Sequence, residues 1–597
     1  MSLIGETELS LKRGHRMTRW GLLAAVMLGI LPGSGLSTAA GGTSSGQPGS
    51  ASAGYLGSAA CAGCHGTISR QFAQTSMGRS IEAITPELLQ SIPTKDSFYD
   101  EKFDRHFEVF VRESKLYQSE FQVGSNQQEV FRDTRRVDWI LGAGTNGMGA
   151  LVEKQGYLFQ GPISFYSKPQ KWGLSPGYEF GDYGFNRPIL AGCIFCHSGR
   201  PRPVGASNGK FESQPFAEMA IGCENCHGPG AAHRTAILGG ATRSKGKNLH
   251  IVNPARLSPV LANNLCMSCH QTGDVRVLKP GKTFQDFRPG QPLDDTLSIL
   301  MEPPTRESPP QNDHLEHYYS LTLSKCYRSS RGMRCINCHD PHVEPSSAEA
   351  PAYFKQRCLT CHSETSCPLP VEARSRTTPA DNCIGCHMPK RDIKVIAHSA
   401  ITNHRILARA GEEFPDVTFH QTTAALPDLI HLNPAPGGKK ALPLLSLLQA
   451  YGELAESRPQ YAERYLAVLR QIERTEPNHS MVQAALGRRD LKGGKLPQAV
   501  SHLERSLQIG PAQANVYGDL ADALAQLGQI EESVSALRSG IALDPFNPVL
   551  QKNLVLRLIQ AKQHAQAKIA LEHYLEAFPQ DSFMRHMLEL ANGGAAK

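Results

Sequence analysis

The sequence contains the pattern Cys-x-x-Cys-His seven times. Two cysteines three positions apart can each form a thioether to a porphyrin vinyl group, and the adjacent histidine then ligates the iron. The pattern is the attachment signature of c-type haem, so it predicts seven covalent haems and electron transport through the chain. In chain order, motifs 1 to 7 comprise Cys61, Cys64 and His65; Cys193, Cys196 and His197; Cys223, Cys226 and His227; Cys266, Cys269 and His270; Cys335, Cys338 and His339; Cys358, Cys361 and His362; and Cys383, Cys386 and His387.

Other uses of paired cysteines fit the pattern less well. Zinc knuckles and redox dithiols also use Cys-x-x-Cys, but neither requires histidine at the next position. Histidine is 23 of 597 residues, so its recurrence after every pair is not a chance result. A disulfide framework is disfavoured because the motifs consume 14 of the 16 cysteines.

A low-spin haem needs a second axial ligand, usually another histidine. We predict that six histidines outside the motifs serve as distal ligands, and that three further side chains are weaker candidates. Histidines elsewhere are interpreted as surface or hydrogen-bonding residues. The six predicted ligands are His233, His314, His317, His342, His398 and His404, and the further candidates are His106, His250 and Met77.

Two of these histidines follow a motif closely. His233 is six residues after His227, and His342 is three residues after His339. A histidine so near a proximal ligand cannot easily fold back across the same porphyrin. We therefore expect each to reach a neighbouring haem. The two remaining cysteines, Cys326 and Cys367, either form a disulfide in an oxidising compartment or stay free as buried thiols.

The N-terminus predicts export. Residues 12–20 are cationic, residues 21–31 are apolar, and Ser37-Thr38-Ala39 is a small-residue cleavage site. Eleven apolar residues are too few to span a bilayer, although an uncleaved anchor remains the alternative. We expect a periplasmic or extracellular protein without stable membrane insertion after cleavage. The formal charge of +7 is offset by the haem propionates, so nucleic-acid binding is not expected.

The region between motifs 1 and 2 differs in character from the motif-rich region. Short aromatic and β-branched runs with glycine-bearing turns predict a small β insertion at about 95–185, including a hairpin around Lys154-Gln155-Gly156. The glycine-rich segment 142–147 lacks the Lys-Ser/Thr of a phosphate-binding loop, so we interpret it as a turn.

The C-terminal part shows an internal repeat. Pro443, Pro477, Pro511, Pro545 and Pro579 recur every 34 residues, which is the tetratricopeptide period of two antiparallel helices per unit. The unit before Pro477 matches poorly, and residues 582–590 are typical of a terminal capping helix. The repeats predict an α-solenoid whose groove binds a protein.

These observations give a mainly α fold in five parts. We expect a signal peptide at 1–39, a flexible linker at 40–54, a seven-haem cytochrome domain of short helices and loops at 55–405, a linker at 406–442, and a tetratricopeptide solenoid at 443–597. Apolar macrocycles would replace the usual aliphatic core in the haem domain.

The chain also resembles a known family. It is similar to bacterial multihaem c cytochromes of the cytochrome c554-like group with C-terminal tetratricopeptide repeats, over roughly 55–590. The resemblance implies exported electron transfer with mostly bis-histidine haems, but no substrate. Pentahaem nitrite reductases carry a Cys-x-x-Cys-Lys haem site, and that motif does not occur here. The matching segments are 55–65, 223–233, 324–327, 339–342 and 383–390.

The sequence therefore predicts an electron carrier rather than an enzyme. It would meet a redox partner protein through haem edges or the solenoid groove. The first alternative is an oxidoreductase with one open distal haem face, acting on a small nitrogen or sulfur compound. The second is a scaffold in which the repeats matter most.

Overall fold

The computed structural model describes residues 54–205, 207–241, 249–310, 316–330, 332–392, 400–419, 428–437 and 441–593. The expected signal peptide, nearly all of the 40–54 linker, and the predicted ligands His314 and His398 lie outside the described residues. Within the described ranges, no helix is long and apolar enough to cross a membrane.

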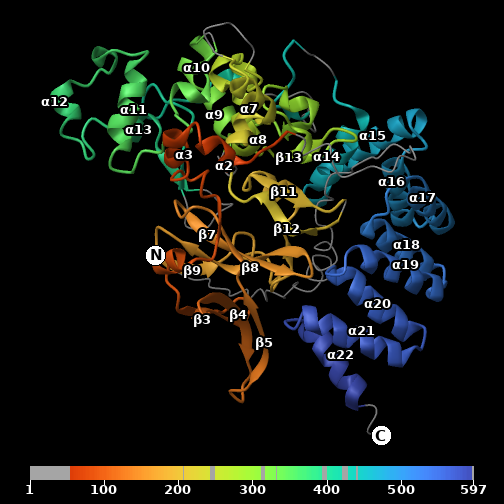
Figure 1. Ribbon diagram of the computed structural model, residues 1–597. Helices are drawn as coiled ribbons and strands as arrows, with labels where there is room; N and C mark the ends of the chain where they lie inside the picture. Colours follow the sequence, from red (N-terminus) through yellow and green to blue (C-terminus); the bar gives the residue numbers. More distant parts are fainter. Residues whose placement is uncertain are drawn as a thin grey trace, which may run out of the picture.

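Two antiparallel sheets form the N-terminal part (Figure 1). The smaller sheet has the order β2-β3-β4-β5, and the larger has the order β1-β6-β7-β8-β10 with β9 on β8. In β3, alternate residues such as Phe107 and Val109 are buried, as expected for a strand with one face on a core. The strands are β1 Ile81–Ala83, β2 Asp96–Asp100, β3 Arg105–Arg112, β4 Lys115–Val123, β5 Glu129–Arg136, β6 Trp139–Leu141, β7 Gly147–Lys154, β8 Tyr157–Tyr166, β9 Lys171–Leu174 and β10 Arg187–Pro188.

The β region is larger than the sequence predicted. Strands begin at β1, before residue 95, and the pair β11 (Arg200–Pro203) and β12 (Phe211–Glu218) extends well beyond residue 185. The chain is therefore an α and β protein rather than a mainly α one. The predicted hairpin is present: β7 and β8 are joined through Gln155 and Gly156, both with positive φ (54° and 83°). Segment 142–147 is a turn between β6 and β7.

Short helices carry or flank the motifs. They are α2 Ser58–Ala62, α3 Gly66–Phe72, α5 Ala191–Phe195, α6 Cys223–His227, α7 Ala231–Leu238, α8 Pro259–His270, α9 His317–Thr322, α10 Lys325–Ser329, the 3₁₀ turn η5 Cys335–Asn337, α11 Ala350–Leu359, α12 Val371–Arg374 and α13 Cys383–His387. From 332 to 392, all of it described, no hydrophobic side chain is buried. This stretch lacks an aliphatic core of its own.

The C-terminal part is a solenoid of antiparallel helix pairs, which confirms the predicted tetratricopeptide repeats. The unit before Pro477, judged degenerate from sequence, is a regular pair, α14 and α15. A terminal helix, α22, follows the fourth pair. The helices are α14 Leu444–Ser457, α15 Ala462–Thr475, α16 Ser480–Lys492, α17 Leu496–Ile509, α18 Ala514–Gln526, α19 Ile530–Leu543, α20 Pro548–Gln560, α21 His564–Ala577 and α22 Ser582–Gly593.

The first repeat packs on a third sheet, of order β13-β14-β17. Its strands are β13 Val275–Leu278, β14 Leu297–Met301 and β17 Ile430–His431, so part of the expected 406–442 linker is integrated into the fold. Arg458, after α14, pairs with Asp274 at 2.6 Å and Glu302 at 2.8 Å. Val275, Val277 and Leu300 share a core with α14 residues. A further strand pair, β15 Lys390–Asp392 and β16 Ala400–Thr402, follows motif 7.

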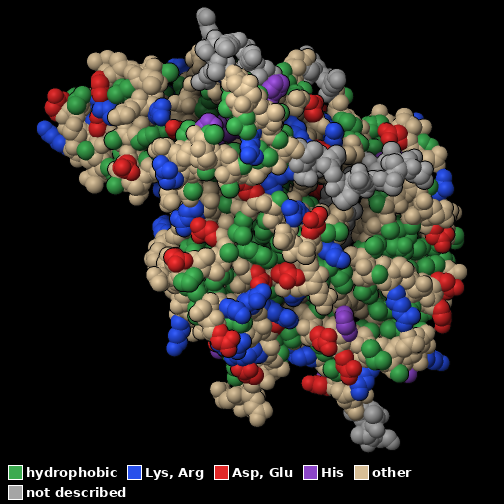
Figure 2. Space-filling view, viewed as in Figure 1, with side chains coloured by type: hydrophobic (Ala, Val, Ile, Leu, Met, Phe, Trp, Pro, Cys, Tyr) green, Lys and Arg blue, Asp and Glu red, His purple; other side chains and the backbone are tan. Residues whose placement is uncertain are grey.

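The last repeats return to the N-terminal sheets. Phe546 packs edge-on against Tyr157 and Phe159, with ring centres 5.3 and 5.0 Å apart. Asn186 donates a hydrogen bond to the Ala577 carbonyl at 2.7 Å, and Asn208 donates one to Asp544 at 3.0 Å. In Figure 2, apolar side chains gather over the strands and over the solenoid helices. The solenoid is thus held at both ends by its own chain.

Candidate cofactor site

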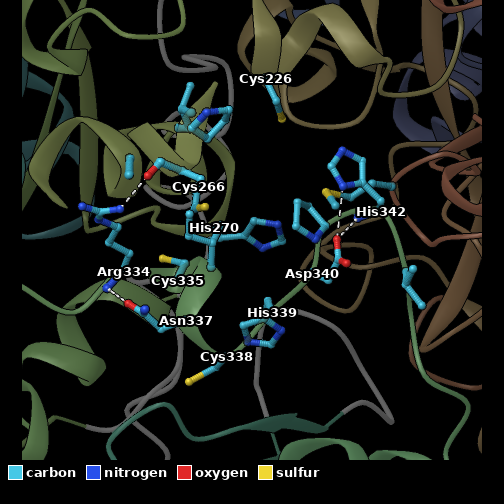
Figure 3. A pocket seen from close by; sticks show the side chains of 18 of the residues that line it. Cys226, Cys266, His270, Arg334, Cys335, Asn337, Cys338, His339, Asp340 and His342 are labelled. Carbon is cyan, nitrogen blue, oxygen red and sulfur yellow. Dashed lines mark hydrogen bonds and ion pairs between the residues drawn. The ribbon is translucent and has the colours of Figure 1, made fainter. Parts of the chain in front are cut away.

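All seven motifs meet at one cavity of about 2790 Å³. Each contributes at least one cysteine to its lining, whereas Cys193, His197 and Cys386 do not line it. The cavity is far larger than the roughly 300–1,000 Å³ typical of small-ligand pockets. Figure 3 shows His270, at the end of α8, and His339, two residues after η5, extending into this space, with Cys226, Cys266, Cys335 and Cys338 around it. The volume suits several large cofactors.

A helical turn sets the geometry of each motif. The His65 amide donates to the Cys61 carbonyl at 2.9 Å, and the same bond joins His339 to Cys335 at 3.0 Å and His362 to Cys358 at 3.0 Å. Residues three and four apart share one side of a helical turn. In motifs 1, 5 and 6, both thiols and the imidazole therefore lie on one side of the turn and all line the cavity, as two thioethers and an iron ligand require.

Two motif histidines each lie nearly parallel to a histidine from outside the motifs. The rings of His227 and His342 are 6.0 Å apart with planes 14° from parallel, and those of His339 and His404 are 6.1 Å apart at 29°. A metal held between two Nε2 atoms, with bonds of about 2.0 Å, separates the ring centres by about 6 Å. The spacing leaves room for one ion between each pair.

A third pair lies beside the second. His270 and His317 are 5.6 Å apart and 13° from parallel, and His317 stacks on His404 at 4.1 Å. Four imidazoles, listed from one end, therefore form a continuous row: His270, His317, His404 and His339.

Hydrogen bonds orient these imidazoles. The Nδ1–H of His227 donates to the Val252 carbonyl at 2.8 Å, and that of His404 donates to the Thr402 carbonyl at 3.0 Å. A histidine that gives Nδ1–H to a carbonyl keeps the Nε2 lone pair for a metal. Nδ1 of His233, His387 and His342 is held in the same way by the Leu249 carbonyl, the Leu407 carbonyl and the Asp340 carboxylate.

Burial keeps the row neutral. Desolvation lowers the pKa of His317 to about 2, and repulsion from the neighbouring His404, His270 and His339 adds to this effect. Desolvation and His339 lower the pKa of His404 to about 4. Neutral imidazole is the form that ligates metals.

The motif thiols differ from those of redox dithiols. Burial raises the pKa of Cys61 to about 11, of Cys226 to about 12 and of Cys358 to about 11. Catalytic dithiols have a lowered pKa. Two motif thiols are exceptions: the Cys269 thiol, and after it Arg276, lowers the pKa of Cys196 well below the usual value, and the Cys266 thiol lowers the pKa of Cys335.

Two buried polar residues that sequence reasoning missed join the motifs. The Glu224 carboxylate, within motif 3, accepts backbone N–H bonds from Leu56 at 3.0 Å, Gly57 at 2.7 Å and Gly230 at 2.7 Å. Asn263, on α8, accepts from the Cys335 amide at 3.0 Å. The role of Glu224 could have been suspected from the sequence, because it is a carboxylate inside a motif that is followed by Gly-Pro-Gly. No sequence pattern indicated the role of Asn263.

Some candidates lie elsewhere. His106 is on β3, between Tyr99 and Phe121 at 4.8 and 5.0 Å, and does not line the cavity. It alternates with the buried residues of its strand and stacks on neighbouring rings instead. His250 also lies outside the lining, whereas Met77 is part of it. Cys326 and Cys367 both line the cavity and are not joined by a disulfide.

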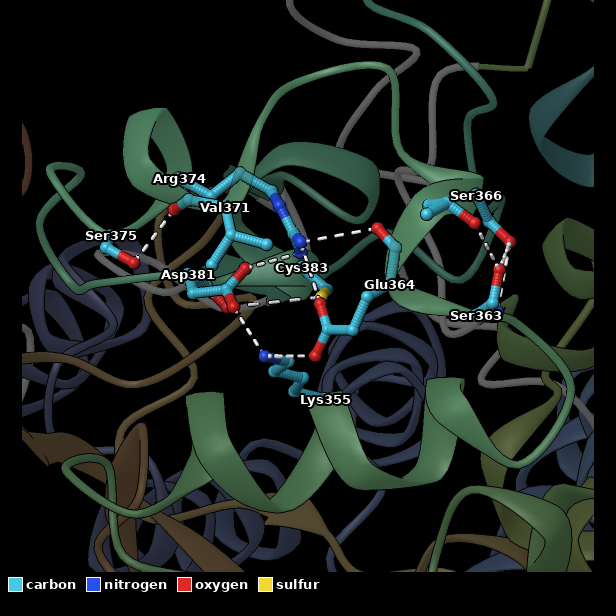
Figure 4. A network of polar contacts seen from close by, with 10 residues as sticks. Lys355, Ser363, Glu364, Ser366, Val371, Arg374, Ser375, Asp381 and Cys383 are labelled. Carbon is cyan, nitrogen blue, oxygen red and sulfur yellow. Dashed lines mark hydrogen bonds and ion pairs between the residues drawn. The ribbon is translucent and has the colours of Figure 1, made fainter.

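Motifs 6 and 7 share a projecting unit, residues 350–387, which we call the terminal lobe (Figure 1). A polar network holds it together (Figure 4). Lys355 pairs with Glu364 at 2.8 Å and Asp381 at 2.5 Å, while Arg374 pairs with the same two carboxylates at 2.7 and 2.8 Å. The network fixes the motif 7 turn against the helix that leads into motif 6.

Comparisons with known proteins concern mainly the repeats. A tetratricopeptide repeat family matches residues 490–553. A cytochrome c-type biogenesis protein, CycH of Rhizobium meliloti (strain 1021), is 28% identical over 170 residues, covering 27% of this chain. The match spans 43% of that relative, less than half of its length.

Two similar solved structures each cover less than a quarter of the chain. A MamA crystal structure is 19% identical and covers 24% of this chain and 84% of its own, with a TM-score of 0.22. The first such domain of Spaghetti (RPAP3), bound to an HSP90 peptide, is 18% identical and covers 20% of this chain and 96% of its own, with a TM-score of 0.19.

Proposed function

We propose that the chain is an exported multihaem c-type cytochrome that carries electrons along seven covalently attached haems. The observation that carries the proposal is the meeting of seven Cys-x-x-Cys-His turns at one cavity, with parallel histidine pairs about 6 Å apart. Covalent haem supplies reversible one-electron chemistry, and the polypeptide tunes it through axial ligands, hydrogen bonds and burial.

The lack of an aliphatic core in residues 332–392 also fits bound haem. The stretch 332–392 buries no hydrophobic side chain, yet it folds around three motifs. Apolar macrocycles against these segments would provide the missing core. The arrangement supports membership of the cytochrome c554-like group with C-terminal repeats, and the curated relative's name also points to a haem-related role.

The proposed iron ligands follow from the pairs. Each motif histidine is a proximal ligand. His342 would be the distal ligand at motif 3, His317 at motif 4 and His404 at motif 5, because each faces that motif's histidine in parallel. His233, with its Nδ1 held by the Leu249 carbonyl, is proposed as a ligand for a remaining motif, together with His314 and His398.

The repeats are proposed to bind a protein partner. Tetratricopeptide solenoids present a concave surface to peptides, as the HSP90 peptide in the Spaghetti structure illustrates. Both ends of this solenoid are held by the chain itself. A partner would therefore engage the central repeats, α16 to α19, while a redox partner approaches the haem edges.

Two measurements on protein exported from a cell that attaches c-type haem test the proposal. Intact mass under denaturing conditions counts the covalent haems, and electron paramagnetic resonance reports their ligands. Seven haems with low-spin signals support the carrier. A high-spin haem that binds cyanide or nitrite would instead favour an enzyme with an open distal face.

A further inference from the structure

The contacts between motifs give them an order in space that differs from their order in the chain. Motif 1 lies against motif 3: the Cys223 amide donates to the Ser58 hydroxyl, in α2, at 2.9 Å, and Glu224 binds the backbone that leads into α2. Motif 2, which separates them in the sequence, ends two residues before Gly199, whose carbonyl accepts a hydrogen bond from Asn225 of motif 3 at 2.9 Å.

Motif 2 lies against motif 4. The Cys196 thiol approaches the Ser268 carbonyl at 3.7 Å. Arg276, on β13, bridges the same two residues, at 3.4 Å to the Cys196 sulfur and 2.6 Å to the Ser268 carbonyl. The insertion of β1 to β10 thus carries motif 2 away from motif 1 and places it beside α8.

Motifs 3, 4 and 5 form the centre. His342, three residues after motif 5, faces His227 of motif 3. Asn263, seven residues before His270 of motif 4, binds the Cys335 amide of motif 5. The imidazole row joins motif 4 to motif 5 a second time.

The terminal lobe joins this centre through motif 5. The Tyr353 hydroxyl, on α11, accepts the Asp340 amide at 3.2 Å, and Phe354 packs edge-on against His339 at 5.4 Å. Beyond that junction, α11 leads to motif 6, and the polar network ties it to motif 7. Figures 1 and 2 show the lobe projecting from the body.

The outer surface of the lobe is apolar around its motifs. Leu359, Leu369 and Val371 are 36%, 54% and 45% exposed, and Cys361 and Cys386 are also exposed. Motif 2 contains Ile194, which is 1% exposed, and Phe195, which packs on Phe284 at 5.4 Å, while its Cys193 is exposed. Cys64, at the motif 1 end, is exposed as well, but the lobe is the end that projects from the body of the molecule (Figure 1).

We propose that the attachment segments form a branched network in which motifs 1, 3, 5, 6 and 7 follow one another, motif 4 joins at motif 5 and motif 2 joins at motifs 3 and 4, and that the terminal lobe is where electrons are exchanged with an external carrier. This inference rests on the proposed function. Transfer between redox centres weakens steeply with distance, so an external carrier must come close to one motif, and the projecting lobe can be approached from several sides (Figure 1).

Photoinduced electron injection into the full-length holoprotein tests this placement. A ruthenium tris-bipyridine maleimide is attached at Glu372→Cys on α12, in a Cys326→Ser/Cys367→Ser background that leaves no other free thiol. The matched control carries the label at Lys115→Cys, an exposed position on β4 outside the cavity lining. Transient absorbance of the haems after a laser flash is the readout.

The lobe label should reduce haem at least tenfold faster than the control label, with slower phases as charge redistributes. Equal rates would overturn the placement. The haem count by intact mass separates the two failures: seven haems with equal rates refute the inference alone, whereas absent haem refutes the proposed function. If the serine variant fails to mature, the label is attached to native Cys367 instead. The rate of haem reduction is then compared with that given by the unattached ruthenium complex at equal concentration. Equal rates in that comparison refute the placement.

Discussion

His227 and His342 come from segments 115 positions apart in sequence, yet their imidazoles lie parallel with ring centres 6.0 Å apart. His342 follows motif 5, whereas His227 belongs to motif 3. The pair therefore links two motifs, and Nδ1 of each ring is held by a hydrogen-bond acceptor.

Replacing His342 should change one haem and leave the others intact. His342→Met substitutes a thioether for one imidazole, which raises the reduction potential of that haem. A redox titration should show one component moved to higher potential, with a matching change in one low-spin resonance. His106→Ala, on the outer sheet, is the control and should alter neither. Unchanged spectra in His342→Met would exclude the assigned pair.

Glu224 should be needed for the junction of motifs 1 and 3. Glu224→Ala leaves three backbone N–H groups without their acceptor, and hydrogen bonds to a charged group contribute about 1.5–3 kcal/mol each. We expect a clear fall in apparent Tm and partial loss of haem at motif 1. Glu224→Gln keeps one acceptor oxygen and should lose less. Glu212→Ala, at an exposed carboxylate on β12, serves as the control. Equal stability of Glu224→Ala and this control contradicts the role.

Lys154 should make stability depend on pH. Its Nζ lies 4.2 Å from the Phe159 ring centre and 4.8 Å from that of Phe546. Burial lowers the pKa of Lys154 from 10.5 to about 7, and the nearby positive charge of Arg135 adds to this effect. The unfolded chain then binds more protons than the folded chain between pH 7 and about 10.5, so the free energy of unfolding rises with pH across that window.

Lys154→Met removes the titrating group. At pH 7 it should raise the free energy of unfolding, by on the order of a few kcal/mol, and with it the apparent Tm. Between pH 7 and 10 the free energy of unfolding should then change less with pH. Lys115→Met, at an exposed lysine, should leave both unchanged. A Lys154→Met protein that retains the full slope would show that another group is responsible.

Gly487 should be required by the helix packing of the second repeat. A Cβ there would lie 2.5 Å from Leu503 Cγ and 3.2 Å from its backbone nitrogen. Gly487→Ala should therefore destabilise the solenoid by about 1–3 kcal/mol, despite the better helix propensity of alanine. At Gly452 the nearest atom is at 3.4 Å, so Gly452→Ala should be neutral or stabilising by up to about 1 kcal/mol. Denaturant unfolding of the two variants compares them directly, and equal loss would refute the packing argument.

The sequence predicted the elements that local patterns determine. The 34-residue proline period located the repeats, and Gln155-Gly156 located a hairpin. The sequence analysis underestimated the extent of the sheets. β1 pairs with β6, and β12 pairs with β11, through contacts that no short sequence pattern predicts. The approach of Phe546 to Tyr157, across 389 positions, was equally invisible in the sequence.

The motif residues were identifiable because attachment chemistry fixes their spacing. The partners of those residues were not, because the pairing of His317 with His270 and of His404 with His339 depends on how separate segments fold together. The contact between motif 2 and α8 is of the same kind, because Cys196 and Ser268 are 72 positions apart in the sequence.

The most direct test of the account is the denatured intact mass of the exported protein, read together with a metal analysis. We predict the mass of the mature polypeptide plus seven haems, with seven iron atoms per chain. Free thiols at the motifs, or zinc in place of iron, would contradict the account.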